Sequence, residues 1–559
     1  MKQPSTSQKE YLISGAILLF VSQTWLSSDL WPLFPHAFVF GALFAALFVL
    51  ASKLFPLNDK RNKWAGTAAL LVPVLFSGAQ FTRSVLHIFV ASFVSLLVLW
   101  IVWRPQRFSN ELEKDFSLFR QLFESISGHP ARLLVTTFGL LCVLGTVLLM
   151  LPAASTTRSF ALVDAAFTSV SAVCVTGLIV LDTPHDFSSF GQGVILFLIQ
   201  VGGLGIMTLS TAVLGLFGNR ISLKHESAVA EIASATNRSS LLGALSVTLL
   251  VTVCCESIGA GLLAVLFKSD SIPWSGAIWK GVFTAISAFC NAGFALDSSS
   301  IIPHQQNAYI MHTVATLIIL GGLSPVVILG ILKFRKERLS LRAKIVCYTS
   351  AALLVLGFVL FLLLEWNHSL EELSIVERLH NAWFQSVTLR TAGFNSVDLS
   401  QTTAATRTIM MMLMFIGGSP GSTAGGIKTT TLFVLVMAVI GALRGRWQVN
   451  VFKRHIPNQT VFRAASITAL AAFGVLCASI LLYASQHMPA ELIAFEVVSA
   501  MGTVGLSLGA TALLGSFGKV VIMICMFIGR VGPLSALTLF HLDRKVSEWF
   551  YPEEDIDVG

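Results

Sequence analysis

The chain has 559 residues, of which 55% are hydrophobic and only 12% are charged, and its net charge is +8. Soluble domains carry roughly 25% charged residues, so the composition excludes an ordinary soluble protein. Many apolar runs reach about 20 residues, enough to cross a bilayer as a helix, and they are too long and continuous for a β-barrel, whose segments alternate over roughly 10 residues. The sequence therefore predicts an all-α polytopic membrane protein.

Four apolar runs come first, and we expect residues 1–103 to form four extra N-terminal transmembrane helices. The first run lacks a basic leader and an A-x-A cleavage site, so we expect it to be retained. These helices pack either at the periphery or at a dimer interface. Residues 104–132 form a polar, cytoplasmic linker with amphipathic spacing, which either lies along the membrane surface or simply connects helices.

Beyond residue 132, a long helix, a short segment and a second long helix follow one another four times. The short segments contain Gly and Ser and are too brief or too interrupted to span a membrane. The four units are predicted at 133–217, 241–333, 345–443 and 462–545, followed by a cytoplasmic tail at 546–559.

Lys and Arg cluster in every second loop, which predicts the orientation of the chain because cytoplasmic loops are enriched in these residues. Both termini are then cytoplasmic, all four short segments face the outside, and the units form parallel repeats. The same bias accounts for the net positive charge without nucleic acid. The Lys- and Arg-rich loops are 51–64, 104–132, 218–240, 333–344 and 442–463.

The short segments align on a glycine, at residues 177, 293, 393 and 505. An aromatic residue stands ten positions before each glycine and a small residue five before it. The aromatic residues are Phe167, Phe283, Trp383 and Phe495, and the small residues are Ala172, Ala288, Thr388 and Ala500. Four matches at near-equal intervals indicate an internal repeat.

A re-entrant pore loop explains this pattern. Non-helical backbone at membrane depth is tolerated only where it is buried in protein or lines a water-filled cavity, and carbonyl oxygens in such a cavity can replace the water shell of a cation. Glycine allows positive φ and leaves room for close approach. One glycine alone equally suits helix packing, but four in register favour a selectivity filter.

The motifs Val173-CVTGL, Cys290-NAGF, Arg390-TAGFNS and Gly502-TVGLS resemble those of the Ktr/Trk/HKT family of potassium transporters, in the membrane-embedded pore subunit. The resemblance covers residues 133–545 and implies four helix–pore-loop–helix units around a pseudo-fourfold axis. It also implies potassium-binding filter residues, which are Val175, Thr176, Gly177, Asn291, Ala292, Gly293, Thr391, Ala392, Gly393, Thr503, Val504 and Gly505. Family members with serine at the first filter glycine favour sodium, so Gly177 points to potassium.

A glycine-rich interruption at 416–427 (IGGSPGSTAGGI) lies inside the second long helix of the third unit. Its small residues and proline cannot continue a stable helix. The resemblance implies an intramembrane gating loop below the filter, whereas the alternative is a helix kink without a gating role. The implied gating residues are Gly417, Gly418, Ser419, Gly421, Ser422, Thr423, Gly425, Gly426 and Lys428.

Arg530 interrupts the apolar run VVIMICMFIGRVGPL. A charge at membrane depth is costly and indicates a functional site. The resemblance implies that Arg530 faces the gating loop; the alternative is that it extends to the cytoplasmic interface. Carboxylates near the outer mouth either concentrate cations or are ordinary solvated groups, and they are Asp164, Asp182, Asp297, Glu377, Asp398, Glu491 and Glu496.

The predicted function is potassium uptake across the plasma membrane, the bacterial inner membrane. The resemblance implies a homodimer and a separate cytosolic nucleotide-binding regulatory ring. Potassium is the expected ion, and a sodium-selective or sodium–potassium cotransporting homologue is the alternative. An intramembrane enzyme would need paired catalytic groups at depth, which we do not find. The eight cysteines lack metal-ligand spacing, so we predict neither a zinc site nor a disulfide.

Overall fold

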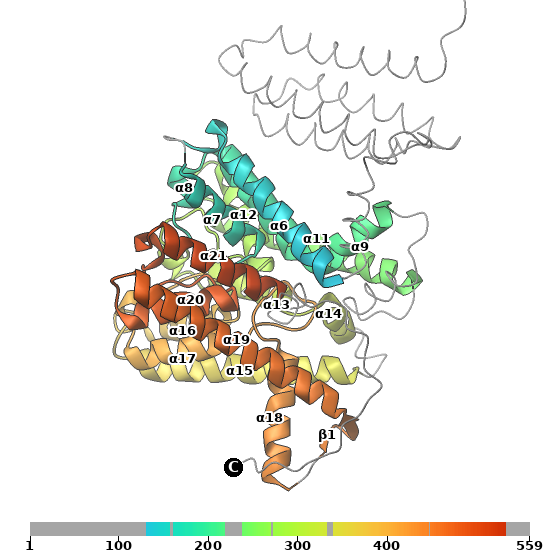
Figure 1. Cartoon of the computed structure of the whole chain (residues 1–559). Helices are drawn as coiled ribbons and strands as arrows, with labels where there is room; N and C mark the ends of the chain where they lie inside the picture. The colour runs from blue at the N-terminus through green and yellow to red at the C-terminus, as the bar shows by residue number, and fades with distance from the viewer. Residues whose placement is uncertain are drawn as a thin grey trace, which may run out of the picture. The chain divides into compact units, whose positions relative to one another are not determined.

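Long helices paired with short buried ones make up the part of the chain that the computed structural model describes (Figure 1). That part comprises residues 130–156, 160–217, 238–269, 272–332, 339–445 and 448–532. The four predicted N-terminal helices, the linker up to residue 129 and the C-terminal tail lie outside the described residues.

The described helices are grouped below by the four units expected from the sequence. Unit 1 contains α6 (Pro130–Leu149), α7 (Leu162–Val173) and α9 (Ser189–Phe217), and unit 2 contains α11 (Arg238–Phe267), α12 (Trp274–Phe289), α13 (Ala308–Gly322) and α14 (Pro325–Leu332). Unit 3 contains α15 (Leu341–Glu365), α16 (Ile375–Thr388), α17 (Ala404–Met414) and α18 (Thr429–Leu443), and unit 4 contains α19 (Asn458–Ser485), α20 (Ala490–Gly502) and α21 (Ser516–Val531).

Shorter elements connect these helices. They are α8 (Thr183–Asp186) and the 3₁₀ turns η3 (Pro152–Ala154), η4 (Ile302–His304), η5 (Leu399–Gln401) and η6 (Thr511–Leu513). Between α18 and α19, β1 (Val449–Val451) and β2 (Arg454–Ile456) form an antiparallel hairpin in which Val449 pairs with Ile456. The sequence predicted only a basic loop at 442–463, and this hairpin was missed. Its turn residues, Phe452 and Lys453, both have positive φ, as a two-residue hairpin turn requires.

Local sequence explains where the short helices begin. Ser374 and Glu377 form a capping box at the start of α16, which satisfies two otherwise unpaired backbone N–H groups. Helices α12 and α20 begin directly after Pro273 and Pro489. Each short helix carries one fully buried aromatic side chain, and these are Phe167, Phe283, Phe384 and Phe495.

Three of the second long helices are interrupted. Helix α9 departs from helical geometry at Gly205, which has φ +36° and ψ −135°. The second long helix expected in unit 2 is instead broken at Leu323 and Ser324, between α13 and α14. That expectation was wrong because Pro325 disfavours helical geometry at the residue before it. In unit 3, residues 415–428 separate α17 from α18.

The hydrophobic core joins neighbouring units around the loops that follow the short helices. Ala392 and Phe394 of unit 3 pack with residues of unit 2, whereas Val504 and Leu506 of unit 4 pack with unit 3. Leu178 of unit 1 packs with unit 4. The four loops are therefore held at the centre of the described fold.

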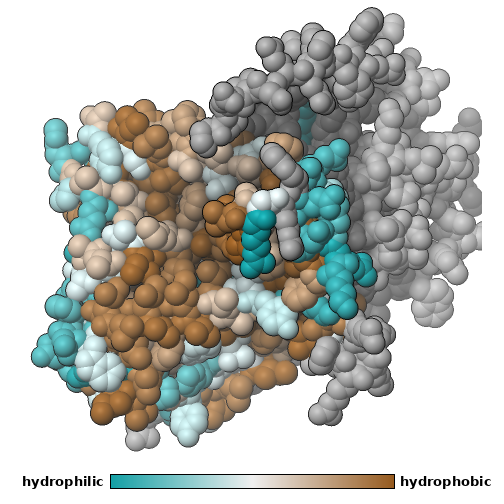
Figure 2. All heavy atoms as spheres, turned by 90° about the horizontal axis from the view of Figure 1, so that it is seen from below, coloured by the Kyte–Doolittle hydropathy of each residue, from teal (hydrophilic) through white to brown (hydrophobic). Residues whose placement is uncertain are grey.

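Among the described helices, three are both long and apolar enough to span a membrane, Val247–Phe267, Leu341–Glu365 and Asn458–Ser485, and six shorter apolar helices accompany them. Large apolar side chains remain exposed along these helices, for example Leu250, Leu363 and Phe473. Figure 2 shows one face with a broad hydrophobic area between hydrophilic margins. The fold is that of a polytopic helical protein whose outer surface suits lipid.

Candidate functional site

The loops after the four short helices share one unusual backbone conformation. We call residues 174–178, 290–294, 390–394 and 502–506 the glycine loops. In each, φ is positive at the residue two before the glycine and again at the glycine itself: Val175 (54°), Gly177 (91°), Asn291 (60°), Gly293 (71°), Thr391 (65°), Gly393 (77°), Thr503 (50°) and Gly505 (90°). Positive φ at a β-branched residue is a genuine outlier and costs about 1–3 kcal/mol. Three of these residues, Val175, Thr391 and Thr503, are β-branched, whereas asparagine adopts positive φ more readily. One conformation repeated four times, and strained in three of the loops, indicates a functional constraint.

The four glycines lie against one another in a closed ring. A methyl group added at Gly177 would come within 3.0 Å of the Ala292 carbonyl oxygen, and one at Gly293 within the same distance of the Ala392 oxygen. The pattern continues from Gly393 to the Val504 oxygen and from Gly505 back to the Thr176 oxygen. Real Cβ atoms do not approach other heavy atoms so closely. A side chain at any of these positions would therefore force the neighbouring loop to move, and the order of contact is that of the units.

Oxygen atoms without hydrogen-bond donors line this ring. Among the described residues, no donor bonds the carbonyl oxygens of Thr176, Ala292, Ala392 or Val504. The buried hydroxyls of Thr176, Thr391 and Thr503 also lack a partner. A buried polar group without a partner is costly, and neutral oxygen ligands suit a hard, partly dehydrated cation. The residues present therefore fit a monovalent cation.

Hydroxyl groups on the short helices hold the glycine loops in place, and the sequence analysis did not single them out. Ser171 accepts a hydrogen bond from the Gly177 N–H at 3.1 Å and donates to the Leu178 carbonyl at 2.7 Å. Ser287 donates to the Phe294 carbonyl at 2.7 Å, and Ser499 accepts from the Gly505 N–H at 3.1 Å. The signal was present in the sequence, because a serine stands six residues before the glycine in three of the four units.

The third unit departs from this register by one residue. Its hydroxyl is Thr388, five residues before the glycine, which accepts from the Phe394 N–H at 2.9 Å. The fully buried aromatic residue is Phe384, while Trp383, which the sequence alignment matched to the other aromatic residues, is only half-buried. The last helical turn is shorter in unit 3. The Ala392 N–H bonds the backbone carbonyl four residues before it, whereas in the other units the N–H groups of Thr176, Ala292 and Val504 bond the carbonyl five residues before them. The alignment of Trp383 and Thr388 was therefore off by one.

The 415–428 segment is a closed loop with an ordered base. Ile416 and Ile427 form a parallel bridge, and the Gly417 N–H donates to the Ile427 carbonyl at 2.8 Å. Gly421 and Gly426 have φ values of 80° and 61°, which other residues rarely adopt. The segment is thus a defined structure and not a simple kink.

The tip of this segment contacts units 2 and 4. The Thr423 hydroxyl bonds the Gly321 carbonyl at 2.8 Å and the Phe289 carbonyl at 3.2 Å, and Ser419 N–H donates to the Gly322 carbonyl at 3.0 Å. Arg530, which is 6% exposed, donates to the Thr423 carbonyl and also to the Gly202 carbonyl of α9. Its guanidinium therefore lies against the segment, as the resemblance implied, and is not extended to an interface.

Other residues predicted from the sequence lie within the segment itself. Lys428 donates to the Ala424 carbonyl at 2.6 Å, and the Ser422 hydroxyl donates to the Ser419 carbonyl at 2.7 Å. Gly425 lies so close to the Thr503 side chain of the fourth glycine loop that a methyl group would overlap with it. The segment and the glycine loops are therefore in direct contact.

Comparisons with known proteins agree with this arrangement. Residues 129–548 match the profile of the TrkH family, described as a cation transport protein. The chain belongs to this family. The chain is 38% identical to the potassium/sodium uptake protein NtpJ of Enterococcus hirae over 77% of its own length and 97% of that protein. It is 36% identical to the Ktr system potassium uptake protein B of Bacillus subtilis, with the same coverage of both chains.

A solved structure shares the fold of this TrkH-family chain. The crystal structure of the potassium transporter TrkH from Vibrio parahaemolyticus matches 86% of the chain and 97% of that structure, with a TM-score of 0.59 and 18% identity. The membership confirms the family predicted from the motifs. It makes the chain a multi-pass membrane protein of a cation transport family and not an enzyme.

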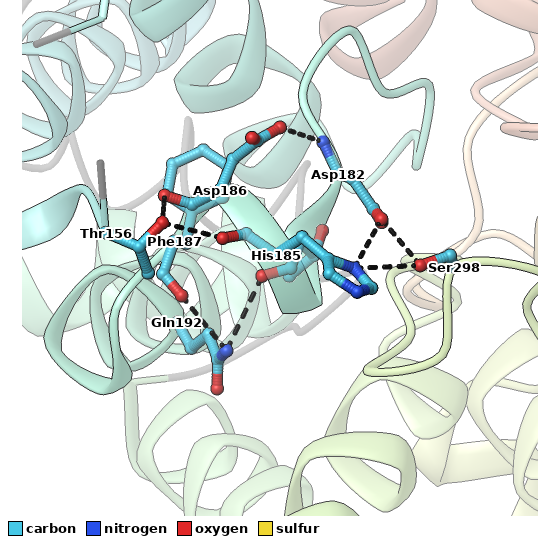
Figure 3. A network of polar contacts seen from close by, with 8 residues as sticks. Thr156, Asp182, His185, Asp186, Phe187, Gln192 and Ser298 are labelled. Atoms are coloured by element: carbon cyan, nitrogen blue, oxygen red, sulfur yellow. Dashed lines mark hydrogen bonds and ion pairs between the residues drawn. The ribbon is translucent and has the colours of Figure 1, made fainter. Parts of the chain in front are cut away.

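Polar contacts join each unit of this TrkH-family chain to the next, near the ends of the short helices. Asp182 of unit 1 accepts from the Ser298 hydroxyl of unit 2 at 2.5 Å and pairs with His185 at 2.9 Å (Figure 3). Backbone and hydroxyl bonds join units 2 and 3 at Asn395. Ion pairs join unit 3 to unit 4, between Arg407 and Glu491 at 3.0 Å, and unit 4 to unit 1, between Lys519 and Asp164 at 2.6 Å. The contacts close a ring around the glycine loops.

The carboxylates expected near the outer mouth all have local partners. Asp297 pairs with Lys280 at 2.6 Å, and Glu496 accepts hydrogen bonds from Ser507 and Thr511 behind the fourth glycine loop. Glu377 and Asp398 cap α16 and η5. These partners favour a structural role over cation attraction for each carboxylate.

Proposed function

We propose that the chain is the pore subunit of a potassium uptake system, in which the four glycine loops form the selectivity filter. The observation that carries this proposal is the closed ring of four loops of like backbone conformation, whose carbonyl oxygens have no donor among the described residues. A cation that enters such a ring exchanges its water shell for these oxygens. Potassium is the preferred ion because the first filter glycine, Gly177, is not replaced by serine, and the name of the Bacillus subtilis relative supports the same assignment.

The loops differ in sequence, and this difference shapes the proposed filter. The filter residues are VTG, NAG, TAG and TVG, so the four units share only the glycine. In the proposed pseudo-fourfold arrangement, the two positive-φ positions are alike in every unit, while the last turn before the loop and its supporting hydroxyl differ in unit 3. Selectivity then depends on the backbone positions that Ser171, Ser287, Thr388 and Ser499 stabilise.

We infer that the 415–428 segment is the gate below this filter, with residues 416–427 as its moving part. Its contacts with units 2 and 4 are hydrogen bonds to backbone carbonyls, and Arg530 holds the Thr423 carbonyl. Such contacts can be exchanged without unfolding the helices. Opening would release Thr423 and draw the segment away from the ion path.

We further propose that the protein resides in the bacterial inner membrane with both termini in the cytoplasm and works as a homodimer. A cytosolic nucleotide-binding ring would bind the basic cytoplasmic loops, among which the β1–β2 hairpin displays Lys453 and Arg454. One relative is named as protein B of a Ktr system, which supports a system of more than one component.

A growth experiment tests the proposed ion. The chain is expressed in a bacterium that lacks its own potassium uptake, and growth at low potassium is compared with that of the Gly177→Ser variant. We expect the unaltered chain to restore growth and the variant to lose potassium preference. A sodium-selective or cotransporting protein, the alternative that one relative's name raises, would instead rescue only sodium-dependent growth.

A matched pair of threonine variants tests the proposed gate. Thr423→Val removes the hydroxyl bonds to Gly321 and Phe289, which contribute about 1–3 kcal/mol together, so basal potassium flux should rise roughly tenfold. Thr468→Val removes only a bond within α19 and should leave flux unchanged. Equal flux in the two variants and the unaltered protein would show that the segment does not close the pathway.

A further inference from the structure

Arg390 stands at a position where the other three glycine loops have small side chains. It directly precedes Thr391, the first residue of positive φ in the third loop, and the matching residues are Cys174, Cys290 and Gly502. Unit 3 is also the unit whose second long helix is interrupted by the 415–428 segment. The long cation and the interruption therefore occur in the same unit, although more than twenty residues separate them in the chain.

The Arg390 side chain connects these two features directly. It is 9% exposed, and its Nη2 donates to the Gly417 carbonyl at 2.8 Å. The backbone N–H of Arg390 bonds the Val387 carbonyl at 3.1 Å, so the residue is fixed at the end of α16. The guanidinium thus spans from the glycine loop to the segment.

Gly417 belongs to the base of the segment and not to its tip. Its N–H bonds the Ile427 carbonyl, and the neighbouring Gly418 carbonyl accepts from the Thr429 N–H. The other two cations bind further along the segment, Lys428 at Ala424 and Arg530 at Thr423. Arg390 therefore holds the point at which the segment leaves α17.

The guanidinium depends strongly on this one contact. Its Nε and Nη1 have no hydrogen-bond partner among the described residues. A buried charge is stabilised only when it is paired or hydrogen-bonded, and bonds to charged groups are the stronger ones. If Gly417 moved away, Arg390 would have to follow it, and Thr391 is the next residue along the backbone.

We propose that Arg390 is a positioning residue that couples the gate to the filter, so that displacement of the 415–428 segment changes the discrimination between potassium and sodium at the third glycine loop. This inference rests on the proposed function of both elements. The gate and the filter would then act together through Arg390 and not independently of each other.

The test uses the purified full-length protein in liposomes, with potassium and sodium fluxes measured separately. Arg390→Gln removes the charge and shortens the side chain, so the potassium/sodium flux ratio should fall by a factor within the roughly 5- to 150-fold range of coupled sites. Arg390→Lys keeps the charge and one donor but loses the planar fork, so its ratio should be intermediate. The control is Arg378→Gln, at the opposite end of α16, where the side chain bonds three other carbonyls; its ratio should not change.

Deleting residues 417–426, which removes the Gly417 carbonyl that Arg390 bonds, separates coupling from a local effect on the filter, because coupled residues are not additive. In the deletion background, Arg390→Gln should cause no further change in the flux ratio. A change of equal size in both backgrounds, or an unchanged ratio in the native background, overturns the inference. If Arg390→Gln does not fold, the same comparison with Arg390→Lys decides.

The two proposals fail in different ways. If the deletion alone leaves basal flux unchanged, the gate assignment itself fails. If the deletion raises flux while Arg390→Gln leaves the ratio of the full-length protein unaltered, the gate stands and only the coupling through Arg390 is wrong.

Discussion

Two glycines of the fourth unit offer a controlled test of the ring. Gly505 and Gly509 both have φ of +90°, but a methyl group at Gly509 would meet no atom within 4 Å, whereas one at Gly505 would overlap the Thr176 carbonyl oxygen. Alanine at either position carries backbone strain of about 1–3 kcal/mol. Gly505→Ala adds overpacking against backbone that cannot rotate away, a further cost of about 1–3 kcal/mol. The difference between the variants therefore measures the close contact between the loops of units 1 and 4.

Both variants are purified, their thermal unfolding midpoints are compared in detergent, and potassium and sodium fluxes are measured in liposomes. We expect Gly505→Ala to have the lower midpoint and to lose potassium preference, because the two loops must separate. Gly509→Ala should lose only the stability that backbone strain accounts for and should keep its flux ratio. If the two variants prove alike in midpoint and ratio, the loops do not meet as described.

Three further predictions follow from the surroundings of the ring. Ser171→Ala leaves the Gly177 N–H and the Leu178 carbonyl without their partner. We therefore expect the free energy of unfolding to fall by about 1–3 kcal/mol and the potassium/sodium flux ratio to fall as well. An unchanged flux ratio would show that the Ser171 hydroxyl does not contribute to selectivity. Lys519→Met and Asp164→Asn should each destabilise slightly, with a coupling of about 0.2–1 kcal/mol in a double-mutant cycle; zero coupling would mean that the pair does not join the units. For Asp297, burial raises the pKa, but hydrogen bonds from His304 and Lys280 outweigh it and lower the pKa below its usual value. The ionised Asp297 carboxylate therefore stabilises the fold above the pKa of the unfolded chain, and this stabilisation is lost as pH falls through the lower folded pKa. The difference in thermal unfolding midpoint between the native protein and Asp297→Asn should shrink only in acid. A difference that shrinks on the alkaline side would contradict this.

The sequence predicted the elements best where a physical constraint acts on neighbouring residues. Glycines that must adopt positive φ and helices long enough to span a membrane both leave local signals, so the family and the helical membrane fold were predicted correctly. The break at Leu323 was missed although Pro325 was visible, because the apolar run continued through it. Gly205 gave no signal, since glycine is common in membrane helices.

The contacts between units could not be predicted from the sequence. Ser298 and Asp182 are 116 residues apart, and nothing local marks them as partners. The one-residue register difference in unit 3 was hidden because Trp383 and Phe384 are adjacent aromatic residues. Arg390 was read as part of a motif, but its role depends on the distance to Gly417, which only the fold provides. The assignments of filter and gate residues stay predictions that the proposed experiments test.

The most direct test of the central claim is ion flux through the purified protein in liposomes, with potassium and sodium gradients compared under the same conditions. A filter formed by the four glycine loops predicts potassium flux well above sodium flux, and loss of that preference in Gly177→Ser. Sodium flux equal to or greater than potassium flux in the unaltered protein would contradict the account.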